Sequence, residues 1–212
     1  YNHDAATDKF RRLGVNVEAH EIITSRDAAL QELDQTKLWG CIAAPGDDLS
    51  DIPGETLKLA DNPKAYEDAE GFLFLSAATW TANQQDLLTG SLKTHGRPVV
   101  IANADVAAPR DDGFSLEPGH FGHLLCDNGL ESVRFFGKPF PEVFQMVEHS
   151  LPGIACDRIA MCGDTLHTDI LGAAACGWRT VLVERDGMFS GVDASAYAEK
   201  SSLAPTWRLQ RI

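Results

Sequence analysis

The chain has 212 residues, of which 44% are apolar and 23% are charged, as in an ordinary globular protein of one or two domains. Its formal net charge of −13 repels phosphate backbones and anionic lipids, so neither nucleic acid nor a membrane is an expected partner. No apolar stretch approaches the roughly 18 residues of a membrane span, and residues 1–20 lack a signal-peptide pattern. We expect a cytoplasmic protein.

The chain begins with Tyr1 rather than methionine and continues directly into a helical pattern formed by Ala5, Phe10 and Leu13. Gly14 ends this pattern, and no strand precedes it. The first residue shown is therefore not expected to be the first residue of the natural protein.

The middle of the chain has the pattern of a small α/β domain. Three apolar runs predict strands, at residues 38–44, 71–75 and 99–101. A stretch with helical periodicity precedes the third run. We predict that residues 27–102 form an inserted α/β domain. Residues 1–26 and 103–212 then form the domain that carries it.

The second half alternates β-branched runs with helical stretches, which is typical of βαβ units in a parallel sheet. The predicted strands are residues 133–136, 158–162 and 180–183. Pro139 and Pro141 suit the start of the first intervening helix, whereas Thr168 and Gly177 suit the N-cap and the C-terminal stop of the second. Because parallel strands place their C-terminal ends at one sheet edge, we expect ligand chemistry at that edge.

Three charged residues fall at these predicted strand ends: Lys138, Asp164 and Asp169. Mg²⁺ prefers oxygen ligands and often uses only one or two protein carboxylates, so the two aspartates are candidate metal ligands. Two carboxylates about 4 Å apart repel by roughly 4 kcal/mol at an effective dielectric constant of 20, and a cation would relieve this repulsion. Each residue alone also has a simpler explanation: Lys138 as a surface lysine, Asp164 as a turn residue and Asp169 as a helix-capping carboxylate. Together they favour a site for Mg²⁺ and phosphate.

The five cysteines form no CxxC pair and are odd in number, which favours neither a disulfide framework nor a metal cluster. Several of them lie in apolar or small-residue runs. We expect buried thiols in a reducing compartment at these positions: Cys41, Cys126, Cys156, Cys162 and Cys176.

Two stretches carry a denser signal. Residues 137–141 read Gly-Lys-Pro-Phe-Pro, and residues 158–173 read Arg-Ile-Ala-Met-Cys-Gly-Asp-Thr-Leu-His-Thr-Asp-Ile-Leu-Gly-Ala. This pattern resembles the haloacid dehalogenase-type (HAD) phosphatases, and within them subclass IIA, which includes sugar-phosphate, nucleotide and p-nitrophenyl phosphatases. Residues 22–25 and 101–105 are similar to the two segments that flank the cap of that subclass.

The resemblance implies an α/β fold, with a three-layer, Rossmann-like parallel-sheet core and residues 27–102 as the inserted cap domain. It implies that Lys138 neutralises phosphoryl oxygens, that Asp164 binds Mg²⁺ directly, and that Asp169 holds the lysine or a metal-bound water. The implied activity is Mg²⁺-dependent hydrolysis of a small phosphorylated substrate, such as a sugar phosphate or nucleotide, through an aspartyl-phosphate.

The nucleophile of that family lies in a D-x-D motif after its first strand, and this sequence contains no such motif. Two acidic pairs, Asp47-Asp48 and Asp111-Asp112, lack the D-x-D spacing after an apolar strand and are interpreted as solvated turns. Without its central strand the sheet would expose unpaired backbone. We expect the missing strand before Tyr1, in a stretch on the order of 30 residues or more. Residues 1–212 alone are expected to be inactive.

Other polar residues give weaker signals. Asn103 and Asp105 end a predicted strand, and we include them as candidate substrate-binding residues, although they could simply terminate the strand. His167 is a third candidate, with solvent exposure as an equal alternative. His120 and His123 have HxxH spacing, but no further ligand accompanies them, and a helix start explains them better than zinc.

The sequence also bears on other classes of function. One alternative is a catalytically inactive relative that binds a phosphorylated ligand or a protein partner, and an upstream D-x-D motif would distinguish the two. The sequence contains no GxGxxG for a dinucleotide-dependent oxidoreductase and no GxxxxGK[ST] for a nucleoside triphosphatase. Substrate identity stays open, and a homo-oligomer is compatible with the sequence.

Overall fold

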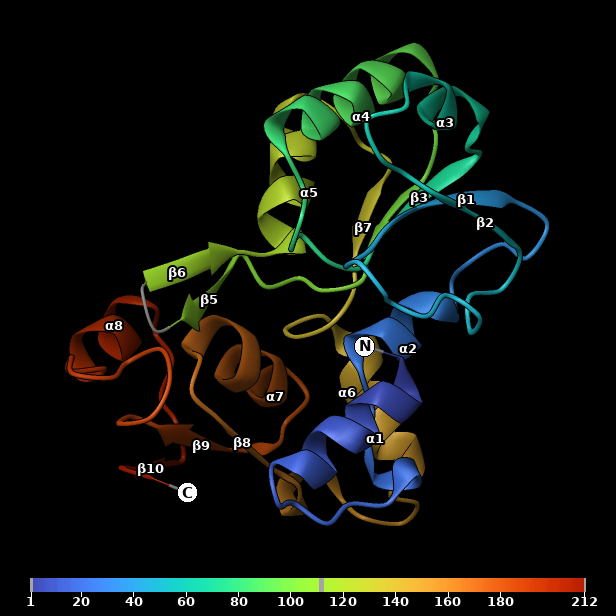
Figure 1. Ribbon diagram of the computed structural model, residues 1–212. Coiled ribbons are helices and arrows are strands. Elements are labelled where there is room, and N and C mark those ends of the chain that lie inside the picture. The colour runs from blue at the N-terminus through green and yellow to red at the C-terminus, as the bar shows by residue number, and fades with distance from the viewer. Residues whose placement is uncertain (1, 111–112, 212) are drawn as a thin grey trace. The chain divides into compact units, whose positions relative to one another are not determined.

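The computed structural model describes residues 2–110 and 113–211, so the acidic pair Asp111-Asp112 lies outside the described residues. The chain divides into two compact units (Figure 1). Unit 1 comprises Tyr1–Ala107 and Leu116–Gly137, and unit 2 comprises Ala108–Ser115 and Lys138–Ile212. None of the helices in the described ranges combines the length and apolar character that a bilayer crossing requires.

Unit 1 is built on a five-stranded parallel sheet in the order β2-β1-β3-β4-β7. Its strands are β1 (Leu38–Ile42), β2 (Glu55–Lys58), β3 (Gly71–Phe74), β4 (Val99–Ile101) and β7 (Val133–Phe135). Its helices are α1 (His3–Arg12), the 3-10 helix η1 (Ala19–Glu21), α2 (Ser25–Leu30), α3 (Pro63–Asp68), α4 (Ala82–Thr94) and α5 (Pro118–Asp127).

One hydrophobic cluster of unit 1 lies between this sheet and helices α3, α4 and α5. Every residue of β3 is buried, as expected of a parallel strand that is covered on both faces. Strands and helices contribute buried side chains to one cluster, including Phe72, Phe74 and Ile101 from the sheet and Tyr66, Leu88 and Leu125 from the helices. The start of α4 is fixed by a capping box in which Thr81 and Gln84 exchange side-chain to backbone hydrogen bonds.

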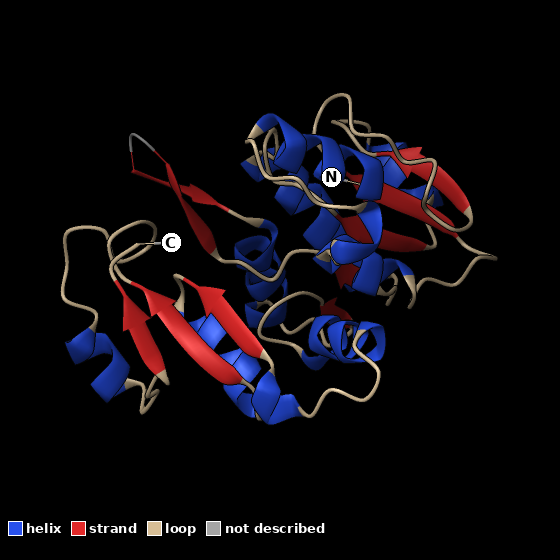
Figure 2. Ribbon diagram, turned by 90° about the horizontal axis from the view of Figure 1, so that it is seen from below, coloured by secondary structure: helices blue, strands red, loops and turns tan. Residues whose placement is uncertain are grey.

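Unit 2 contains a three-stranded parallel sheet in the order β10-β9-β8, whose strands lie side by side in Figure 2. The strands are β8 (Ala160–Gly163), β9 (Arg179–Val183) and β10 (Trp207–Leu209). The helices are α6 (Pro141–Ser150), the 3-10 helix η2 (Cys156–Arg158), the π-helical turn η3 (Leu166–Ile170), α7 (Leu171–Ala175) and α8 (Ser195–Lys200). A two-stranded ribbon of β5 (Ala107–Arg110) and β6 (Gly113–Leu116) falls mostly within this unit.

The predicted α/β class with parallel sheets is confirmed, but one predicted sheet is wrong. We expected residues 133–136 to share a sheet with the strands near residues 160 and 180. Instead β7 pairs with β4 in unit 1, whereas β8 pairs with β9 in unit 2. The physical reason is packing: Val133 and Phe135 lie against the hydrophobic core of unit 1. Chain order alone does not show which sheet a strand joins.

The sheet of unit 1 also bears on the expected division into core and cap. The predicted boundary after residue 102 falls between β4 and β7, which are hydrogen-bonded neighbours. The two compact units accordingly have other boundaries than the predicted domains. Which residues act as a cap stays a prediction.

The helix after β8 begins earlier than predicted. Thr168 was expected to be its N-cap, but the π-helical turn already begins at Leu166, and Thr165 holds the N-cap position. The carbonyl of Thr165 accepts hydrogen bonds from the backbone N–H groups of Asp169 and Ile170, at 3.1 and 3.2 Å. The predicted stop is confirmed, because Gly177 follows α7 with a φ of +74°.

All five cysteines are free, but only one of them is buried as predicted. Cys41 is buried in β1, and this burial raises the pKa of its thiol to about 12. The expected burial is wrong for Cys126, Cys156 and Cys162, which are exposed. Cys162 lies on the same face of β8 as Ala160, and both residues are exposed.

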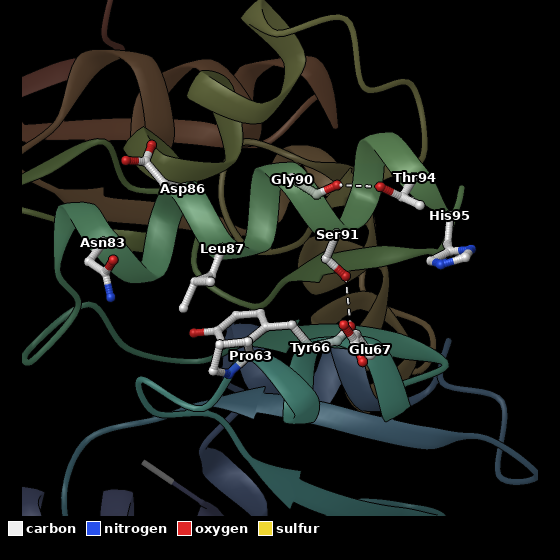
Figure 3. Close-up of a pocket in the computed structure, with 10 residues that line it drawn as sticks. All are labelled: Pro63, Tyr66, Glu67, Asn83, Asp86, Leu87, Gly90, Ser91, Thr94 and His95. Atoms are coloured by element: carbon white, nitrogen blue, oxygen red, sulfur yellow. Dashed lines mark hydrogen bonds between the residues drawn. The ribbon is translucent and has the colours of Figure 1, made fainter.

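A hollow of about 530 Å³ lies between α3 and α4 in unit 1. Figure 3 shows Asn83 and Asp86 toward one end of α4 and Thr94 and His95 toward the other. The residues that line this hollow include none of the six predicted site residues. The predicted site must therefore be built from other elements.

Candidate functional site

Lys138 and Asp169 form an ion pair within unit 2. The Nζ atom of Lys138, which precedes α6, lies 2.5 Å from Oδ1 of Asp169 in η3. The Asp169 side chain is only 4% exposed, whereas that of Lys138 is 41% exposed. A buried carboxylate requires compensating partners, and Oδ2 of Asp169 accepts a second hydrogen bond from the backbone N–H of Thr165 at 3.1 Å. Asp169 therefore anchors the ammonium group of a half-exposed lysine.

Asp164 follows β8 directly and is held by two donors. Its Oδ2 accepts a hydrogen bond from the backbone N–H of Met188 at 2.8 Å, and its Oδ1 accepts one from the Thr165 hydroxyl at 3.3 Å. Thr165 thus contacts Asp164 through its side chain and Asp169 through its backbone. This one residue links the two candidate carboxylates.

Two glycines permit the close packing around the ion pair. A Cβ atom on Gly163 would lie 2.3 Å from both Cγ and Oδ2 of Asp169. A Cβ atom on Gly172 would lie 2.4 Å from the Phe144 ring and 3.0 Å from Cα of Pro139. The distances of 2.3 and 2.4 Å are far below ordinary van der Waals contact, so neither position accepts a side chain without a shift of its neighbours.

The other candidates are placed as follows. His167 is exposed in η3, between the two aspartates in sequence. Asn103 and Asp105 follow β4 in unit 1, where Oδ1 of Asn103 accepts a hydrogen bond from the Asp105 backbone N–H at 3.2 Å. This local turn is a common way to end a strand. A substrate-binding role for these three residues stays a prediction.

The residues that sequence reasoning missed are Gly163, Thr165, Gly172, Gly187 and Met188. Thr165 and Gly163 lie inside the quoted motif, but their roles depend on contacts that spacing does not show. The backbone N–H of Met188 reaches Asp164 across 24 residues of sequence. No sequence pattern identified that contact.

The donor chemistry of this site suits Mg²⁺ at one carboxylate. Asp169 is engaged by Lys138 and Thr165, whereas Asp164 offers oxygens held by neutral donors. Among the described residues no group of three or more His, Cys, Asp or Glu side chains could hold a metal ion. Mg²⁺ commonly combines one or two protein carboxylates with water and phosphate oxygens. Asp164 therefore fits as one protein ligand.

The constellation matches a known sequence family. Residues 135–207 match the family model described as HAD-hydrolase-like, and this range includes Lys138, Asp164 and Asp169. Residues 135–207 thus carry the sequence pattern of this HAD-like family. The resemblance found in the sequence is thereby confirmed.

Comparisons that cover nearly all of this chain agree with this match. A protein named acid sugar phosphatase from Staphylococcus aureus (strain MRSA252) is 20% identical over 208 residues, which cover 96% of this chain and 75% of that protein. Among solved structures, a possible sugar phosphatase of the HAD superfamily from Cytophaga hutchinsonii superimposes with a TM-score of 0.81 at 20% identity, covering 99% of this chain and 78% of that one. A p-nitrophenyl phosphatase from Archaeoglobus fulgidus gives a TM-score of 0.78 at 20% identity, with coverage of 99% and 78%. These structures show that the chain shares their fold.

Proposed function

We propose that this HAD-like protein is a Mg²⁺-dependent phosphatase that hydrolyses a small phosphorylated metabolite, such as a sugar phosphate or nucleotide, in the cytoplasm. The observation that carries this proposal is the ion pair between Lys138 and the buried Asp169. Thr165 links Asp164 to this pair by hydrogen bonds to both aspartates. The names of the similar proteins, acid sugar phosphatase and p-nitrophenyl phosphatase, support the same reaction class.

Each charged residue has a distinct task in this proposal. Lys138 places a positive charge against the phosphoryl oxygens, where negative charge must be stabilised during transfer. Asp169 keeps the ammonium group in place, because it is buried and accepts a hydrogen bond from it. Asp164 would hold Mg²⁺, which when bound neutralises phosphate oxygens. The aspartate nucleophile that the family resemblance implies is not among these residues.

Phosphate release by the complete natural protein tests the proposal. We expect hydrolysis of p-nitrophenyl phosphate and of at least one sugar phosphate or nucleotide with Mg²⁺ present, and loss of turnover when EDTA removes the metal. Restoring Mg²⁺ to the same sample should restore the rate. Tight binding of a phosphorylated ligand without any turnover would instead support the catalytically inactive alternative.

A further inference from the structure

The turn after β9 approaches Asp164 more closely than any side chain would permit. Gly187 has a φ of +117°, a backbone conformation that residues with side chains rarely adopt. A Cβ atom at this position would lie 2.0 Å from Oδ2 of Asp164 and 2.5 Å from its Cγ. The carboxylate of Asp164 therefore packs directly onto the Gly187 backbone.

The next residue supplies a directed hydrogen bond to the same oxygen. The backbone N–H of Met188 donates to Oδ2 of Asp164 at 2.8 Å, a normal length for a charge-assisted bond. Backbone donors have no side-chain rotamers, so the position of this N–H is set by the turn itself. The turn therefore orients the Asp164 carboxylate, and the same hydrogen bond stabilises the turn.

The turn is anchored in the core of unit 2. Phe189 is buried with Leu166, Ile170 and Leu182, and Met188 packs against the same cluster. The backbone N–H of Ser190 donates to the Gly187 carbonyl at 3.1 Å, which closes the turn. Because Phe189 is held by apolar packing, the Met188 N–H is presented to Asp164 from a fixed support.

We propose that Gly187 and the backbone N–H of Met188 form a positioning element for Asp164, which sets the orientation of that carboxylate toward Mg²⁺. The proposal rests on the function proposed above, because it takes Asp164 as the metal ligand. The Thr165 hydroxyl completes the element by donating to Oδ1. Partners of this kind around a ligand typically change metal affinity 10- to 100-fold when they are altered.

A pair of glycine substitutions tests this element. In Gly187→Ala the new methyl group must displace the Asp164 carboxylate, whereas Gly191→Ala adds a methyl at another positive φ of the same segment, +79°, with nothing within 4 Å. Both variants incur backbone strain, but only the first meets Asp164. Circular dichroism and thermal unfolding show whether each variant folds, and calorimetric titration with Mg²⁺ gives its affinity.

The expected result is a Mg²⁺ dissociation constant raised about tenfold or more in Gly187→Ala and unchanged in Gly191→Ala. Thr165→Val removes one hydrogen-bond donor to Asp164 without adding bulk, and it should also raise the Mg²⁺ dissociation constant. Equal Mg²⁺ affinities in all variants, or equal losses in both glycine variants, would overturn the proposal. Failure of the proposed phosphatase function is distinguishable, because it would show as absent turnover in the unmodified protein, whatever the titrations give.

Discussion

Replacing Lys138 with alanine is expected to lower kcat/KM for phosphate release about 10²- to 10³-fold in the complete natural protein. The loss follows because the substitution removes the positive charge that Asp169 holds at 2.5 Å. Arginine should restore little of the rate, because its planar guanidinium does not reproduce the compact ammonium group beside Asp169. Steady-state kinetics with saturating Mg²⁺ measures the effect.

A loss of stability must be separated from this loss of chemistry. Lys138→Ala leaves Asp169 buried without its cationic partner, and breaking a fully buried pair costs about 3–5 kcal/mol. The cost here should be smaller, since the Lys138 side chain is 41% exposed. The double variant Lys138→Ala, Asp169→Asn removes the unpaired charge and should recover stability but not turnover. Normal turnover in Lys138→Ala would show that the lysine does not contact the reacting phosphate.

Replacing Asp164 with asparagine is expected to reduce Mg²⁺-dependent turnover by about two orders of magnitude or more, since it removes the charge of the proposed metal ligand. The side chain keeps its size, and a carbonyl oxygen can still accept the hydrogen bond from Met188. The fold should therefore survive. Turnover measured against Mg²⁺ concentration should show a higher metal requirement as well as a lower maximum.

Asp193→Asn is the matched control for that substitution. Asp193 is an exposed aspartate of unit 2 whose carboxylate accepts a hydrogen bond from the Ser195 backbone N–H at 2.8 Å, and this bond lowers its pKa. The substitution removes one negative charge from the same unit, at a residue that does not contact Asp164. We expect normal turnover and an unchanged Mg²⁺ requirement in this variant. If both asparagine variants lost turnover equally, the effect would be one of overall charge rather than of metal ligation.

The sequence was sufficient for most elements of the fold. Apolar runs located the strands at residues 71–74, 99–101 and 179–183 to within one residue. The sequence did not show which strands pair, because pairing depends on contacts between residues far apart in the chain. Val133 and Phe135 have the same local pattern whether β7 joins β4 or β8, and only packing against the core of unit 1 selects the first.

The charged residues of the site were predictable, but their supports were not. Lys138 and Asp164 follow predicted strands closely, and Asp169 comes next in the same motif, so a single sequence displays all three. Gly187 and Met188 carry no such signal, because a backbone N–H has no residue type and a glycine has many uses. Their relation to Asp164 exists only once β8 and β9 lie side by side.

A crystal structure of the complete natural protein with Mg²⁺ and the phosphate analogue orthovanadate tests the central claim most directly. We expect Mg²⁺ at about 2.0–2.1 Å from a carboxylate oxygen of Asp164. We expect the analogue within hydrogen-bond distance of Nζ of Lys138, with Asp169 still holding the lysine. Metal and analogue bound away from these three residues would contradict the assignment of this site.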